Sequence, residues 1–90
     1  MKQRWHIYFY GRVQGVGFRY TCKATASKYD VTGWVKNLNN GSVEMIVEGE
    51  AAELRCYVDE VCSSTHGRVD DKKVTKSVAA GTFTSMKIVR

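Results

Sequence analysis

The sequence predicts an α+β fold, an α/β sandwich in which two helices cover one face of an antiparallel sheet. Strand-like stretches occur five times along the chain, and stretches with helical spacing of apolar residues occur twice. An Asn-Gly pair separates two of the strand-like stretches, which is typical of a tight hairpin. The length of 90 residues allows one domain, residues 1–90, with a single modest core.

The first strand and the first helix lie on either side of a glycine-rich turn. Trp5, Ile7 and Phe9 share one face of a stretch of strand-forming residues. From Phe18 onwards, apolar residues recur on one face of a helix. We therefore expect a helix that begins at Phe18 and ends near Asp30.

The remaining elements follow from the hairpin signal and a second helical stripe. We expect strands at 31–38 and 42–48, because the Asn-Gly pair between them tolerates positive φ at both turn positions. A helix over 50–62, a strand over 69–78 and a final strand over 82–90 complete the chain. Right-handed crossovers place both helices on the same face of the sheet. The order β-α-β-β-α-β is that of a ferredoxin-like fold, here with an additional C-terminal strand.

The charge and the N-terminus limit the classes of protein to consider. The net charge of +5 favours acidic partners, either small phosphorylated molecules or nucleic acid. The basic residues are scattered, so we expect a basic surface and no nucleic-acid partner. No apolar run is long enough to span a membrane, and the first residues lack the pattern of a signal peptide. We therefore expect a cytoplasmic protein without a membrane partner.

The cysteines and histidines do not predict a metal site. The three cysteines form no C-x-x-C pair, and the two histidines are not placed at ligand spacing around them. Cys22 and Cys62 fall on the apolar faces of their helices, so we expect buried free thiols. Cys22 is a poor candidate for a nucleophile, because no His or Asp close to it in sequence offers itself as a base.

The stretch from Gly11 to Arg19 carries the strongest functional signal. Three glycines allow backbone N–H groups to approach a ligand closely, and the helix that follows adds N–H donors and a favourable dipole. Arg19 adds a planar fork that suits phosphate or carboxylate oxygens. The spacing fits neither the dinucleotide-binding fingerprint nor the Walker loop. We therefore expect an anion site, above all for a phosphoryl group, although the glycines alone would suit a generic turn equally well.

A binding module is the alternative class of function. Ferredoxin-like folds include RNA-recognition domains, and residues 15–20 weakly resemble their glycine–aromatic motif. In those domains the motif lies on a central strand, where its aromatic rings stack on bases. Here it lies between a strand and a helix, which favours an enzyme over an RNA-binding or other non-catalytic phosphate-binding module.

The chain resembles the acylphosphatase family over nearly its whole length. One family motif is matched by Gly11-Arg12-Val13-Gln14-Gly15-Val16-Gly17-Phe18-Arg19. A second is matched by Gly33-Trp34-Val35-Lys36-Asn37, followed by Asn40-Gly41-Ser42-Val43-Glu44. The ferredoxin-like order is also the fold of that family. Two motifs in order and at family-like spacing make the resemblance specific.

The resemblance implies hydrolysis of the carboxyl–phosphate anhydride of acyl phosphates. Arg19 matches the catalytic arginine that binds phosphate, and Asn37 matches the asparagine that positions the attacking water. The proton of that water would pass to the phosphate of the substrate itself. No metal and no organic cofactor is implied. The backbone amides that would hold the phosphate are those of Gln14, Gly15, Val16, Gly17 and Phe18.

Further expectations concern the substrate and the assembly. Inorganic phosphate should be both product and inhibitor, and we expect a monomer. Related domains also occur in larger proteins that handle carbamoyl phosphate, but the chain ends at Arg90, so we expect a free-standing hydrolase. No acyl pocket is evident in the sequence, so we expect broad specificity. For Tyr20, which follows the arginine, a place at the mouth of the site and a packing or surface role both stay open.

Overall fold

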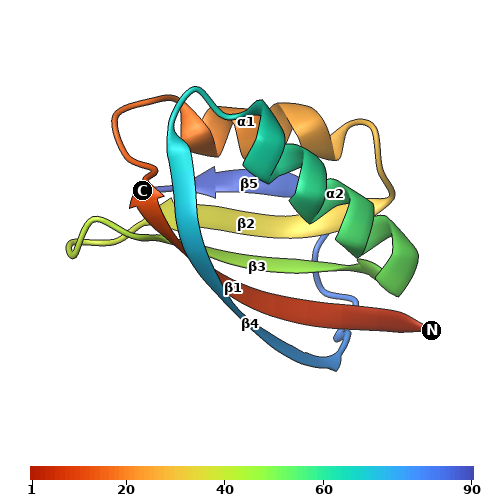
Figure 1. Cartoon of the computed structure of the whole chain (residues 1–90). Helices are drawn as coiled ribbons and strands as arrows, with labels where there is room; N and C mark the ends of the chain where they lie inside the picture. Colours follow the sequence, from red (N-terminus) through yellow and green to blue (C-terminus); the bar gives the residue numbers. More distant parts are fainter.

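The computed structural model of the chain describes residues 1–90, in which two helices cover one face of a five-stranded sheet (Figure 1). The strands lie in the order β4-β1-β3-β2-β5. This arrangement confirms the ferredoxin-like order with an added strand. The elements are β1 (Lys2–Arg12), α1 (Phe18–Ala26), β2 (Val31–Asn37), β3 (Val43–Glu50), α2 (Ala51–Ser64), β4 (Arg68–Val78) and β5 (Met86–Val89).

The sheet is mixed, so the prediction of a wholly antiparallel sheet is wrong at one edge. β1 pairs antiparallel with β3 and β4, and β2 pairs antiparallel with β3, but β5 pairs parallel with β2. The segment 79–85 carries the chain from β4 at one edge to the opposite edge, and the chain then runs back against the direction of β4. Because this segment is used for the crossing, β5 begins at Met86 and is shorter than expected.

The core lies between the sheet and the two helices. Trp5, Ile7 and Phe9 of β1 are buried in this core, which confirms the prediction that these alternate residues share one face of the strand. The ring of Phe9 meets the ring of Phe18 edge to face, with centroids 5.0 Å apart. Burial of such a side chain stabilises the fold by roughly 1.5–3 kcal/mol. Phe18, the first residue of α1, therefore holds the start of this helix against the sheet. This contact fixes the position of Arg19, the next residue in the helix.

α1 is shorter than predicted. It ends at Ala26, and the next three residues form tight turns in which their N–H groups bond to carbonyls three positions earlier. The hydroxyl of Ser27 also donates to the carbonyl oxygen of Ala24, at 2.8 Å. These bonds satisfy carbonyls at the end of the helix, so the chain can turn towards β2 before Asp30.

The segment 79–85 is fastened to the sheet by a buried carboxylate. Glu48 of β3 is only 3 % exposed and accepts hydrogen bonds from the N–H of Ala80 (2.9 Å) and the N–H of Gly81 (3.0 Å). The Nε of Arg4 donates to the same carboxylate at 2.7 Å. Burial alone would raise the pKa of Glu48, but these hydrogen bonds outweigh it and hold the pKa below its ordinary value.

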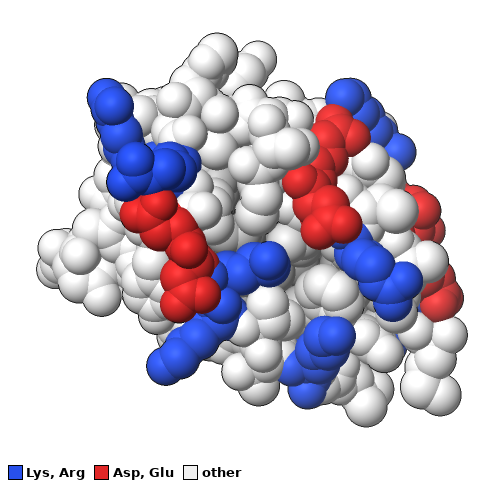
Figure 2. Space-filling model, in the orientation of Figure 1, with Lys and Arg blue, Asp and Glu red and all other residues white.

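Charged side chains are distributed without a single dominant patch on the face seen in Figure 1. Figure 2 shows basic and acidic side chains interleaved over this face, despite the net charge of +5. Neither helix is long and apolar enough to cross a membrane.

Candidate functional site

The loop between β1 and α1 presents backbone donors that the protein itself leaves free. Gly15 and Gly17 have φ of 74° and 73°, in the left-handed region that favours glycine. Gly17 caps α1, and no side chain accepts a hydrogen bond at this end of the helix. None of the N–H groups of residues 14–18 donates to a backbone carbonyl. Such a row of donors at a helix N-terminus is suited to an anion.

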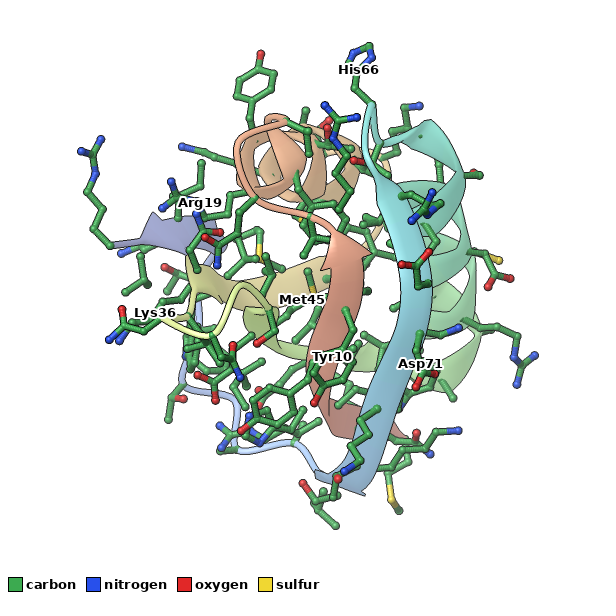
Figure 3. All side chains as sticks on the ribbon, turned by 60° about the vertical axis from the view of Figure 1, so that its left-hand side comes forward. Tyr10, Arg19, Lys36, Met45, His66 and Asp71 are labelled. Atoms are coloured by element: carbon green, nitrogen blue, oxygen red, sulfur yellow. The ribbon has the colours of Figure 1, made fainter.

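Arg19 lies beside this loop, between the start of α1 and the end of β5 (Figure 3). Its side chain is half-buried, and Nη1 donates to the carbonyl oxygen of Val89 at 3.3 Å. It forms no salt bridge with any carboxylate of the chain. Because a guanidinium has five N–H donors, most of them stay available to an anionic ligand.

Asn37 is the last residue of β2, and its side chain is half-buried. Its Oδ1 atom is buried and accepts no hydrogen bond within the protein. A buried acceptor without a partner costs about 1–3 kcal/mol, which a bound ligand or water could offset. An amide can both accept and donate, so this side chain is suited to holding a small polar molecule.

Gln14 has a role that the sequence did not reveal. Its Nε2 donates to the carbonyl oxygens of Leu38, at 2.7 Å, and Ser42, at 2.9 Å. The side chain thereby ties the glycine-rich loop to the turn between β2 and β3, where Asn37 ends its strand. Its partners lie more than twenty positions along the chain, so no local pattern could have predicted these contacts.

These elements surround one pocket of about 260 Å³. It brings together Arg19 and Asn37, which belong to different motifs of the sequence. Gln14 and Val16 do not line it, although both belong to the predicted loop. No carboxylate or imidazole side chain lines it either. The lining residues are Val13, Gly15, Gly17, Phe18, Arg19, Tyr20, Asn37, Ile88 and Arg90.

The cysteines lie away from this pocket. Cys22 is buried and free, as expected, and burial raises the pKa of its thiol. A thiol in that state is a poor nucleophile. Cys62 is only half-buried, so the expectation of burial is wrong there. It lies at the margin of the apolar face of α2.

The chain contains no group of three or more His, Cys, Asp or Glu side chains that could hold a metal ion.

The motif that weakly resembles RNA-recognition domains is not on the sheet. Residues 15–20 form the turn before α1 and the first residues of that helix. Tyr20 is 70 % exposed and lines the pocket, so it lies at the rim of the pocket and does not pack in the core. The aromatic residues of this motif are therefore not arranged to stack bases on a central strand.

Comparisons with known proteins agree with these features. A family model described as Acylphosphatase matches residues 5–88. The curated acylphosphatase of Syntrophus aciditrophicus is 36% identical over 90 residues, which cover 99% of this chain and 94% of that protein. The curated acylphosphatase of Bacillus subtilis is 46% identical over 68 residues, which cover 74% of this chain and 75% of that protein.

Solved structures show the same likeness in three dimensions. The crystal structure of acylphosphatase from Bacillus subtilis superposes with a TM-score of 0.90 and 37% identity, over 98% of this chain and 99% of that one. A full-length HypF in its phosphate- and nucleotide-bound form superposes with a TM-score of 0.88 and 29% identity, over 100% of this chain but 12% of that one. The family match over residues 5–88, the curated relatives and these structures together show that the chain belongs to the acylphosphatase family.

Proposed function

We propose that this protein hydrolyses acyl phosphates to a carboxylate and inorganic phosphate in the pocket that contains Arg19 and Asn37. Hydrolysis of acyl phosphates follows from membership of the family, and the assignment to these residues is our inference. The observation that carries it is that Arg19 and Asn37, from separate motifs, line one pocket beside Gly15 and Gly17.

The phosphoryl group would be held by the guanidinium of Arg19 and by N–H groups of the loop 14–18, in which Gly15, Gly17 and Phe18 line the pocket. Phosphoryl transfer spreads charge over the equatorial oxygens of the phosphorus, so catalysis depends on positioning and on electrostatic stabilisation. Donors that are already in place need little rearrangement as that charge develops. The unpaired N–H groups of the loop and the unpaired charge of Arg19 support this role. These donors supply the positive charge that the phosphoryl group needs, so the mechanism uses no metal.

The attacking water would be held by Asn37. The water oxygen forms a bond to phosphorus while the bond from phosphorus to the acyl oxygen breaks, and the carboxylate leaves with that electron pair. No acidic or imidazole side chain lines the pocket to accept the proton, which supports its transfer to a phosphoryl oxygen of the substrate. The unused Oδ1 acceptor of Asn37 is suited to orient a water O–H.

The variant Asn37→Ala tests this assignment, because it separates chemistry from binding. We expect kcat for benzoyl phosphate to fall by roughly 10², the scale for a positioning group, while the inhibition constant of inorganic phosphate changes by a few-fold at most. Steady-state hydrolysis with phosphate as a competitor measures both quantities. Unchanged kcat with weakened phosphate binding would make Asn37 a binding residue and would contradict the proposed mechanism.

Inorganic phosphate should compete with the substrate, because it fits the same donors as the transferred group. We propose that the protein acts as a monomer, since the pocket of one copy already contains both Arg19 and Asn37. Sedimentation of the active protein at assay concentration tests this. A larger active species would contradict the proposal of a monomer.

A further inference from the structure

Two of the few large apolar side chains that the fold leaves exposed lie at the same pocket. The exposed ones are Met1 (95 %), Tyr20 (70 %), Val78 (76 %) and Ile88 (37 %). Single exposed apolar residues are common and need no explanation. Tyr20 and Ile88, however, both line the pocket of Arg19, although they come from α1 and β5.

Neither side chain is a buried member of the hydrophobic core. Tyr20 and Ile88 are absent from the hydrophobic core and from the partly buried residues packed against it. Their neighbours in the pocket, Val13 and Phe18, are buried core residues. The pocket therefore combines a polar end, formed by the donors of the loop, with an apolar wall that reaches the surface.

The two residues of the apolar wall are chain neighbours of residues at the phosphate site. Tyr20 directly follows Arg19, and Ile88 directly precedes Val89, whose carbonyl oxygen accepts the hydrogen bond from Arg19. Because Arg19, Tyr20 and Ile88 line the same pocket, a phosphoryl group bound at Arg19 would leave its acyl substituent close to these two side chains.

We infer that Tyr20 and Ile88 bind the acyl group, and that the enzyme prefers acyl phosphates with an apolar group of ring size over those with a small one. This inference rests on the proposed function. It departs from the expectation of broad specificity, because the sequence alone does not show that an apolar wall lies at the phosphate site. Arg90 also lines the pocket and would favour an anionic acyl group instead. We favour the apolar group, because two side chains from separate elements form the wall.

The test compares benzoyl phosphate with acetyl phosphate in Tyr20→Ala and Ile88→Ala. We expect kcat/KM for benzoyl phosphate to fall about 10-fold in each variant, and kcat/KM for acetyl phosphate to change less than about 2-fold. Tyr20→Phe should keep the ratio of the unaltered protein, because the ring supplies the contact. Val78→Ala, at an exposed apolar residue of β4 outside the pocket, is the matched control and should leave both values unchanged.

The readouts separate this inference from the function on which it rests. Acetyl phosphate turnover and the inhibition constant of phosphate report on the phosphate site, whereas the ratio between the two substrates reports on the acyl group. An equal loss with both substrates, or no change in the ratio, would overturn the role of Tyr20 and Ile88. Faster turnover of succinyl phosphate than of butyryl phosphate, lost in Arg90→Gln, would overturn the apolar preference in favour of an anionic one.

Discussion

Two places in this molecule offer similar hydrogen-bond donors, and only one of them contains a carboxylate that accepts from them. At the segment 79–85, two backbone N–H groups and an arginine donate to the buried carboxylate of Glu48. At the loop before α1, the N–H groups of residues 14–18 and the guanidinium of Arg19 have no carboxylate partner. We refer to these as the filled nest and the open nest.

The difference shows how one chemical arrangement serves stability in one place and binding in the other. In the filled nest the anion is part of the chain, so its hydrogen bonds contribute to folding and fasten the segment that leads to β5. In the open nest the anion must come from solution, so the same interactions become binding energy. Changes in the filled nest should therefore affect stability, and changes in the open nest should affect activity.

The largest effect is expected at the arginine of the open nest. Arg19→Lys keeps the charge but loses the planar fork, so kcat/KM for benzoyl phosphate should fall by about 10²–10³. The free energy of unfolding should change little, because Arg19 makes a single hydrogen bond to the protein, at 3.3 Å. Near-native turnover in a folded variant would show that the fork of Arg19 does not hold the phosphoryl group.

The acceptor of the filled nest should show the opposite behaviour. Glu48→Ala leaves two N–H groups and Arg4 without their partner, so urea denaturation should give a loss of about 2–3 kcal/mol. Below the unfolding transition, kcat should stay within a few-fold. Glu50→Ala is the control, because the salt bridge of Glu50 to the Met1 amino group is exposed and should contribute less than about 1 kcal/mol. Equal losses in both variants would contradict the role of the nest.

A pair of glycines allows the two nests to be compared at nearly the same φ angle. Gly17 in the open nest and Gly81 in the filled nest have φ of 73° and 74°, and a Cβ added at either would meet no atom within 4 Å. Valine at either position should cost about 1–2 kcal/mol through backbone strain. Only Gly17→Val should weaken phosphate binding, by about 10-fold, as measured by phosphate titration. Equal phosphate affinity in both variants would mean that Gly17 serves only the turn.

The smallest effect is a dependence of stability on pH that only the filled nest should show. The pKa of Glu48 is held below its ordinary value, so its contribution is complete above the pKa of an unfolded glutamate, about 4.3, and is lost as pH falls through the folded pKa. The free energy of unfolding should therefore fall more steeply below about pH 5 in the unaltered protein than in Glu48→Gln. Parallel pH profiles would contradict this.

Local patterns predicted most of the fold and the residues of the open nest, but they did not predict the filled nest. The alternation of Trp5, Ile7 and Phe9 and the Asn-Gly hairpin depend on neighbours in sequence, so they could be recognised along the chain. Glu48 bonds to N–H groups more than thirty positions away, which only the crossing segment brings near. The parallel pairing of β5 depends on the same crossing. The position of Asn37 beside Arg19 could be expected only from the resemblance to a family. The spacing of the two residues along the sequence does not show that they lie at one site.

The position of β5 also determines where the molecule should begin to unfold. It has four residues, pairs with β2 alone, and carries the carbonyl that holds Arg19. Met86 is its only buried core residue, so most of the core would stay covered by the other four strands if this edge detached. The edge strand is therefore expected to behave as a separate cooperative unit in native-state hydrogen exchange, with amides that exchange through local opening before those of β1 and β3. Activity should then disappear at a lower denaturant concentration than the bulk of the secondary structure, because the site depends on the element that opens first.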